Sequence, residues 1–268
     1  MTTPDAHLRY VYAVCRPLGV PLRAGLTGVA GAPPRELAHR GLVAVVGDVP
    51  ERDFAQEPLR ARLEDLDFLA ATARAHEHVV TALARVTTPL PLRLVTVFRD
   101  DDAVRALLEE QADLFRARLD RLCGRVEWGV KVYLEPAPEE PEPARDPDRA
   151  ERTAAPTGRD YLRRRSAART AHEETLRRAE RVTQDLHADL AGRSAATRLH
   201  RSQPPELAGT RDRNTLNAAY LVDRSRSAAF VKHIGTVADR LPGLRVELTG
   251  PWAGYSFTGE TEDEGDAA

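Results

Sequence analysis

The chain has 268 residues, of which 42% are hydrophobic, 30% charged and 5% aromatic, and its formal net charge is −2. This length suits one large or two modest domains, and we expect two. No stretch approaches 18 uninterrupted apolar residues, and the first residues contain no apolar signal core. The sequence therefore predicts a helix-rich globular protein in the cytoplasm, with no membrane span and no secretion signal.

The basic residues are unusual, because 37 of the 39 are arginine and only Lys131 and Lys232 are lysine. An arginine-rich nucleic-acid binder is one interpretation. Against it, Asp and Glu are interleaved with the arginines in nearly equal number, so no segment carries the one-sign field that phosphate binding requires. A compositional bias of the genome explains the arginines more simply, and we expect no nucleic-acid partner.

The first half of the chain is predicted to form an α+β domain over residues 1–134. Strands are expected at residues 8–14, 41–50, 92–98 and 128–135, and helices at 58–86 and 100–124. Asp100 is suited to cap the second helix and Gly124 to end it. The order β, β, α, β, α, β is close to a ferredoxin-like sandwich, in which helices cover one face of an antiparallel sheet.

The second half is predicted to be a related α+β domain over residues 158–257. Residues 135–157 contain six prolines among many acidic residues, which predicts a linker. A long helix follows, with Leu176, Ala179, Leu186 and Leu190 on its apolar stripe, and it is expected either to lie across the domain or to form a coiled coil with a partner. Further elements are expected in the order strand 195–202, strand 216–224, helix 228–241 and strand 244–250, before a disordered acidic tail at 258–268.

No catalytic or metal-binding pattern emerges from the residues. His76 and His78 are two positions apart, so on a helix their side chains point about 200° apart and cannot share one ion. The glycines between Gly19 and Gly31 match no phosphate-binding loop, and no serine has a nucleophile-elbow setting. Cys15 and Cys123 lack metal or redox spacing and are predicted to be buried thiols. We therefore expect no enzyme activity, no cofactor and no metal.

Eight segments resemble the GvpL/GvpF family of gas vesicle proteins, and they occur in the expected order over nearly the whole chain. They are YVYAV (10–14), GLVAVVGDVP (41–50), AHEHVV (75–80), PLPLRLVTVF (89–98), EWGVKVY (127–133), GRDYL (158–162), NAAYLVDR (217–224) and LTGPWAGYSF (248–257). The chain departs from the family pattern at Ala253-Gly254, where a Pro-Pro pair is expected. The loss of two prolines predicts a looser turn into Tyr255.

The resemblance implies a two-domain α+β protein that associates with gas vesicles, which are hollow gas-filled shells built from a small and very hydrophobic protein. Its members are implied to be assembly factors or minor structural components that assist nucleation or keep the shell subunit from aggregating. The expected partners are the gas vesicle shell protein and other gas vesicle accessory proteins. The residues alone leave a second hypothesis open, a ferredoxin-like small-molecule-binding or regulatory enzyme.

Six residues are candidates for partner binding. They are Tyr161, Leu176 and Leu186 on the long helix, and Trp252, Tyr255 and Phe257 near the C-terminus. Aromatic side chains in loops near a chain end are of the type enriched at protein interfaces. Core packing is the alternative for Trp252, Tyr255 and Phe257, and for another aromatic residue, Trp128, it is the interpretation that we favour.

Overall fold

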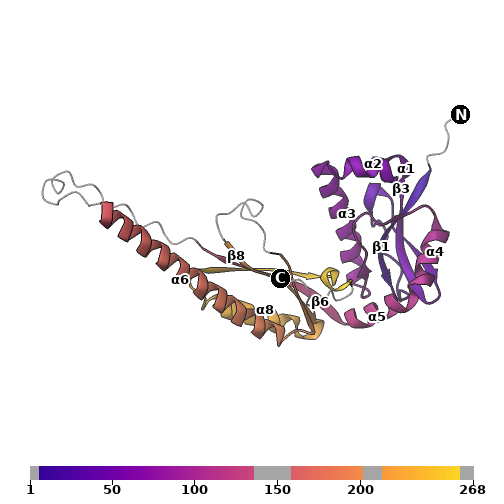
Figure 1. Ribbon diagram of the computed structural model, residues 1–268. Helices are drawn as coiled ribbons and strands as arrows, with labels where there is room; N and C mark the ends of the chain where they lie inside the picture. The colour runs from indigo at the N-terminus through magenta and orange to yellow at the C-terminus, as the bar shows by residue number, and fades with distance from the viewer. Residues whose placement is uncertain (1–5, 136–157, 202–212, 260–268) are drawn as a thin grey trace. The chain divides into compact units, whose positions relative to one another are not determined.

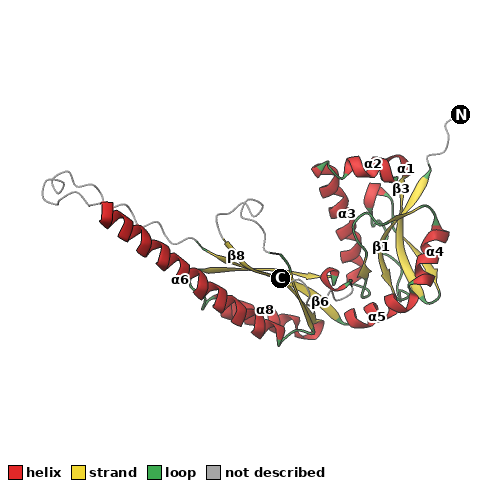
Figure 2. Cartoon of the chain, in the orientation of Figure 1, coloured by secondary structure: helices red, strands yellow, loops and turns green. Residues whose placement is uncertain are grey.

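The computed structural model describes residues 6–135, 158–201 and 213–259, apart from a few side chains early in the long helix. It is an α+β protein with two sheets and one long helix, which confirms the predicted class (Figures 1 and 2). Two compact units are present, and each is discontinuous in sequence. The first unit is Met1–Trp128, Leu221–Ser227 and Gly250–Ala268, and the second is Gly129–Tyr220 and Ala228–Thr249. The predicted domain limits stay predictions, and most of the predicted linker and tail lies outside the described residues.

The sheet of the first unit has the order β2-β3-β1-β4, and β5 also pairs with β1. Its strands are β1 (His7–Cys15), β2 (Arg35–His39), β3 (Leu42–Pro50), β4 (Leu90–Pro91) and β5 (Val97–Phe98). The central pair β1 and β3 is antiparallel, with a register shift between Val11 and Ala13. Both strands are rich in Val, β1 also contains two Tyr, and both are almost wholly buried, so the two predictions made for them are confirmed.

Of the strand predicted at residues 92–98, only residues 97 and 98 form a strand. The chain pairs with β1 at β4, leaves it, and pairs again at β5. Between the two, Thr96 N–H donates to the Arg93 carbonyl, and Val95 has a positive φ of 59°. A β-branched residue rarely adopts this conformation. The turn is held because the Val95 N–H donates to the Tyr10 hydroxyl, 3.1 Å away.

The helix predicted at residues 58–86 is divided into α2 (Gln56–Arg62) and α3 (Leu66–Ala84), and a short helix α1 (Glu51–Phe54) precedes them. The break before α3 follows from capping, because the Asp65 carboxylate accepts hydrogen bonds from the N–H groups of Asp67 and Phe68. The helix predicted at 100–124 is likewise α4 (Asp101–Glu110) and α5 (Ala112–Leu122). Asp100 caps α4 as predicted, and Gly124 follows α5 with a φ of 70°.

Helices cover both faces of the first sheet, whereas the ferredoxin-like arrangement places them on one. Arg9 of β1 donates to Asp101 of α4 at 2.6 Å, and the next residue, Tyr10, bonds to His76 of α3 at 3.0 Å. Because successive side chains of a strand point to opposite faces, α3 and α4 lie on opposite sides of the sheet (Figure 1). The side chains of Tyr10 and Val11 point to different faces of the sheet, and both are fully buried. Each face must therefore be covered.

The second sheet has the order β7-β8-β6-β9. Its strands are β6 (Arg125–Leu134), β7 (Ala196–Leu199), β8 (Arg213–Asp223) and β9 (Leu244–Trp252). The predicted strand at 128–135 is β6, but it belongs to this sheet and not to the first. The Arg224 N–H donates to the Gly124 carbonyl, and the side-chain amide of Asn214 donates to the Val132 carbonyl. The start of β6 thus lies beside the end of β8, so the two strands run antiparallel.

The long helix of the second unit is α6 (Gly158–Ala191), and a shorter helix α8 (Ser227–Ala238) accompanies it. The C-terminal half of α6 packs on β8: Thr183 bonds to Thr215 at 3.1 Å, and His187 bonds to the Tyr220 hydroxyl at 2.8 Å. The buried stripe of α6 contains Ala179, Thr183, Leu186 and Leu190. For this half of the helix, the interpretation that it lies across its own domain is therefore confirmed.

The two cysteines have different environments. Cys15 is fully buried on β1, where burial raises the pKa of its thiol to about 12. Cys123 is exposed, so the prediction of a buried thiol there is wrong. It occupies the C-cap of α5, one residue beyond the buried Leu122.

Candidate functional site

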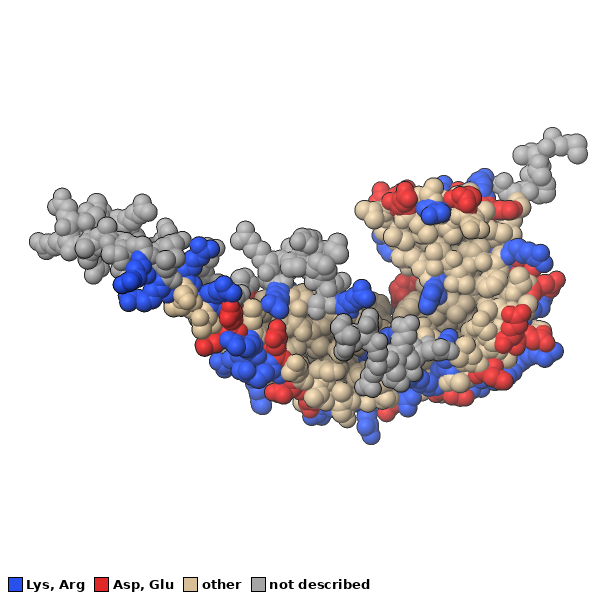
Figure 3. Space-filling view, viewed as in Figure 1, with Lys and Arg blue, Asp and Glu red and all other residues tan. Residues whose placement is uncertain are grey.

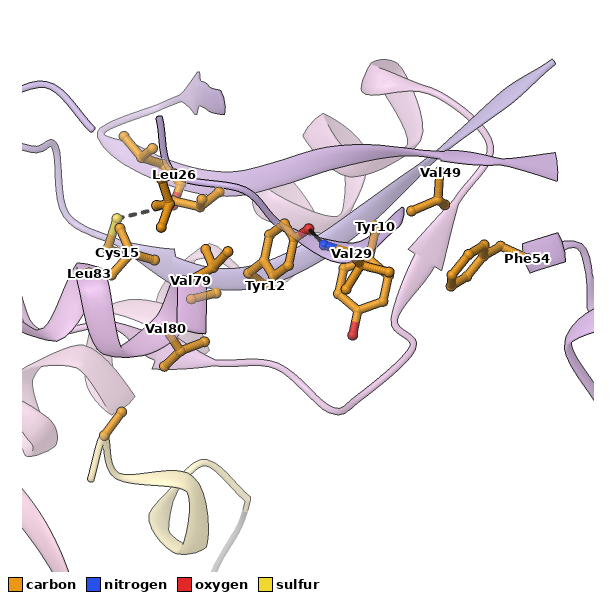
Figure 4. Close-up of a cluster of buried hydrophobic side chains, with 14 residues drawn as sticks. Tyr10, Tyr12, Cys15, Leu26, Val29, Val49, Phe54, Val79, Val80 and Leu83 are labelled. Atoms are coloured by element: carbon orange, nitrogen blue, oxygen red, sulfur yellow. Dashed lines mark hydrogen bonds between the residues drawn. The ribbon is translucent and has the colours of Figure 1, made fainter. Parts of the chain in front are cut away.

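The candidate site is the C-terminal corner, which we define as residues 250–257: the end of β9 and the short helix η3 (Tyr255–Phe257). Although it is among the last described parts of the chain, it belongs to the first unit. Ala253 is a member of the buried core of that unit, and Tyr255 packs against the same core. Figure 4 shows this core around β1 and α3. The end of the chain therefore completes a core that begins in β1.

A buried carboxylate holds the corner in place. Glu127 of β6 is only 8% exposed, and its two carboxylate oxygens accept from Ser256: the backbone N–H at 2.8 Å and the hydroxyl at 2.6 Å. Hydrogen bonds to an ionised acceptor are roughly twice as strong as neutral ones. Glu127 therefore fixes both the backbone and the side chain of η3.

Close packing fixes the turn where two prolines were expected. A Cβ atom at Gly254 would lie 2.5 Å from the Leu122 side chain, and Ala253 is 8% exposed. Tyr255 N–H donates to the Ala253 carbonyl at 2.7 Å. Packing against α5 therefore restricts the backbone of the corner, as the rings of a Pro-Pro pair would.

Beneath the corner lies Trp128, which is 9% exposed and donates its indole N–H to Ser227 at 2.8 Å. Gly250 passes over it with a φ of 130°, and a Cβ atom there would lie 2.9 Å from the indole ring. Only glycine combines this backbone conformation with so close an approach. Trp128 is thus a core residue, as the sequence favoured.

A cluster of buried polar rings connects the corner to α3 and β1. The His76 ring lies 5.7 Å from those of Tyr10 and Tyr12 and 6.2 Å from that of Tyr255. Burial raises the pKa of the Tyr255 hydroxyl, and the carboxylates of Glu77 and Glu127 raise it further. Burial likewise raises the pKa of Tyr12 to about 12. These hydroxyls therefore stay protonated at neutral pH, and that of Tyr12 accepts a hydrogen bond from the Val29 N–H at 2.8 Å.

His76 makes the stability of this cluster dependent on pH. Burial lowers the pKa of His76 to about 4 from its ordinary 6.5, so the folded protein keeps this ring neutral. Between pH 6.5 and 4 the unfolded chain binds the proton and the folded chain does not, so the free energy of unfolding falls as the pH falls. We expect a contribution of at most about 1.4 kcal/mol per pH unit. Chemical denaturation of wild type and His76→Asn at several pH values measures this slope.

The matched control for this prediction is His78→Asn, which changes an exposed histidine on the same helix. The slope should be unchanged in the control and smaller in His76→Asn, which lacks the contribution of the buried imidazole. If both variants keep the slope of the wild type, the pH dependence does not come from His76.

The six candidate contact residues occupy different environments. Trp252 is 42% exposed, Tyr255 and Leu176 are half-buried, and Phe257 and Leu186 are 3% and 5% exposed. The side chain of the sixth candidate, Tyr161, lies outside the described residues. Trp252, Tyr255 and Phe257 are brought together in the corner, whereas the other three belong to α6 of the second unit. Sequence reasoning missed Glu127 and Ser256, whose pairing has no local signal.

Three further findings bear on the predicted chemistry. Within the described ranges, no group of three or more His, Cys, Asp or Glu side chains is arranged to hold a metal ion. None of the helices described is long and apolar enough to cross a membrane. Figure 3 shows basic and acidic side chains interspersed on the visible face of each unit.

Comparison with known proteins gives consistent results. The family model "Gas vesicle synthesis protein GvpL/GvpF" matches residues 8–259. The chain is 52% identical over 260 residues to gas vesicle protein L of Streptomyces sp. (strain CB03234), with 96% of this chain and 95% of that protein covered. It is 28% identical over 256 residues to gas vesicle protein F of the same organism, with 92% and 98% covered.

The fold is also similar to that of solved structures. The crystal structure of gas vesicle protein GvpF from Anabaena sp. PCC7120 aligns with a TM-score of 0.67 at 17% identity, covering 94% of this chain and 96% of that one. GvpF from Microcystis aeruginosa aligns with a TM-score of 0.64 at 18% identity, covering 94% and 99%. The family model spans nearly the whole chain, and the chain therefore belongs to the GvpL/GvpF family of gas vesicle proteins.

Proposed function

We propose that the protein acts in gas vesicle formation as a non-enzymatic accessory or minor structural component, and that it binds the hydrophobic shell subunit through the C-terminal corner. Family membership supports the role in gas vesicle formation. In this proposal the protein covers apolar surface of the shell subunit until the shell grows, and it is located at the vesicle. The higher identity to protein L than to protein F of the same organism favours an L-type role.

The proposal rests on the side chain of Trp252, which is exposed although the backbone around it is held in place. Interface residues that contribute most to binding are commonly Trp, Tyr or Arg held in a fixed conformation. Trp252 is 42% exposed, while its neighbour Ala253 is buried and Ser256 is held by Glu127. A large apolar side chain held in this way loses little conformational entropy on binding.

Substitution of Trp252 by alanine tests the proposal. We expect Trp252→Ala to lower the affinity for the shell subunit by about 2 kcal/mol, or roughly thirtyfold, and to leave the folded protein intact. Co-purification of tagged variants with the shell subunit measures binding. Electron microscopy of vesicles in a deletion strain complemented with each variant measures their number and shape.

Leu66→Ala is the matched control, because Leu66 is 77% exposed in the same unit but lies on α3. It should co-purify with the shell subunit as well as the wild type does. Wild-type binding and normal vesicles with Trp252→Ala would show that the corner is not the contact. A deletion strain that forms normal vesicles in normal number would contradict the role itself.

A further inference from the structure

The second unit contains an apolar groove of about 590 Å³. One wall is the side of α6 that carries Thr175, Ala179 and Val182, which are spaced by four and three residues and so face the same way. The floor includes Leu134 at the end of β6. The opposite wall is the turn between α8 and β9, residues 241–244, of sequence Leu-Pro-Gly-Leu.

Two arginines line the groove without an acidic partner. Arg178 of α6 and Arg240 after α8 are both exposed, and neither forms an ion pair within the described residues. Arg193, just beyond the end of α6, is by contrast paired with Asp189 at 3.0 Å. Glu135 is the one carboxylate among the described lining residues, so cationic groups outnumber anionic ones there two to one.

The dimensions of the groove favour a helix as its occupant. The lining residues of α6 span two helical turns, about 10 Å. Apolar side chains spaced by three and four residues on a second helix fit against such a wall, as in other helix-in-groove complexes. Acidic residues beside that apolar stripe would meet the two guanidinium groups, which bind carboxylates in a defined geometry.

We propose that this groove binds an amphipathic helix of a partner protein, with acidic side chains flanking its apolar face. The site is in the second unit and is independent of the C-terminal corner, so either proposal can fail without the other. The apolar side chains of the partner lie along Ala179, Val182 and Leu134, and its carboxylates pair with Arg178 and Arg240. The charge pairs determine which helix is accepted, and the apolar contacts supply most of the affinity.

Two synthetic helices test the proposal with the full-length protein. Both are about 18 residues long, above the length at which isolated helices are marginal, and both have the same leucine stripe. One has glutamates beside the stripe and the other has lysines. Fluorescence anisotropy should show binding of the acidic helix and at least tenfold weaker binding of the basic one. In the double variant Arg178→Glu/Arg240→Glu, the acidic helix should bind roughly tenfold more weakly and the basic helix more tightly than to wild type.

The control variant is Arg165→Glu/Arg201→Glu, which makes the same change of charge at exposed arginines of the same unit that do not line the groove. It should retain the preference of the wild type. Val182→Gln should weaken the binding of the acidic helix without reversing the preference for charge. Circular dichroism verifies that each variant is folded.

Three outcomes would overturn the proposal. The first is equal binding of both helices by the wild type, and the second is the same change of preference in the control as in the groove variant. The third is saturable binding of dodecanoate that depends on Arg178 and Arg240 while neither helix binds. That result would assign the groove to a small amphiphilic anion.

Discussion

Replacing Phe257 by alanine is expected to lower the free energy of unfolding by about 3–5 kcal/mol. The side chain is 3% exposed and ends the corner that packs on the core of the first unit, so its removal leaves a cavity in a region that includes the closely packed Leu122 and Gly254. Guanidinium denaturation followed by circular dichroism measures the change. The loss should appear as a lower denaturation midpoint with an unchanged slope.

Trp252→Ala is the informative comparison for Phe257→Ala. The two aromatic residues are five positions apart, yet Trp252 is 42% exposed. We expect Trp252→Ala to change stability by about 0.5 kcal/mol or less, as for most surface substitutions. A large loss in Trp252→Ala, or a small one in Phe257→Ala, would mean that the core and surface roles assigned to these residues are reversed.

Glu127→Ala is expected to lower the free energy of unfolding by about 3 kcal/mol. The substitution removes the acceptor of two hydrogen bonds from Ser256, and bonds to a charged acceptor contribute about 1.5–3 kcal/mol each. Because the corner then loses both hydrogen bonds to Glu127, Trp252 should become more mobile. Tryptophan fluorescence anisotropy in a Trp128→Phe background reports that mobility, and denaturation reports the stability.

A double-mutant cycle separates the bonds of Glu127 from its other contacts. Ser256→Ala removes the hydroxyl bond but retains the backbone N–H bond, so it should cost about half as much as Glu127→Ala. In Glu127→Ala/Ser256→Ala the two costs should not add, because both changes remove the same hydroxyl bond. Full additivity would show that Glu127 stabilises the corner through groups other than Ser256.

Much of the fold was predictable, because most elements have strong local patterns. The central strands β1 and β3 are runs of Val, Ala and Tyr, and the long helix α6 has an apolar residue every three or four positions. No local pattern, however, shows which sheet a strand joins. The strand β6 alternates as well as any other in the chain, but its partners β8 and β9 come more than 70 residues later.

Helix boundaries were less predictable where capping competes with periodicity. The apolar spacing continues from α2 into α3, but Asp65 accepts two backbone N–H groups and starts a new helix. Periodicity alone does not show such a break, because a capping side chain competes for the same backbone groups that would continue the helix.

The candidate site was predictable in part. The aromatic residues of the corner were identified as core or interface residues from the sequence, and the structure distinguishes Trp252 from Phe257 by exposure. The residues that hold the corner could not be found in this way. Glu127 and Ser256 are 129 positions apart, and a single glutamate within a strand gives no local indication of its partner.

Ala253 belongs to the core of the first unit, but it is translated long after the other residues of that core. The ribosome produces β1 and α3 long before it reaches the corner, and at about 5–20 residues per second the interval after α3 is on the order of 10–30 s. Throughout that interval the nascent chain lacks the residues that pack on this core, among them Ala253 and the Tyr255 ring beside His76. A chaperone at the tunnel exit would meet this incomplete core on every molecule, and a chain that terminates before residue 253 would retain it permanently.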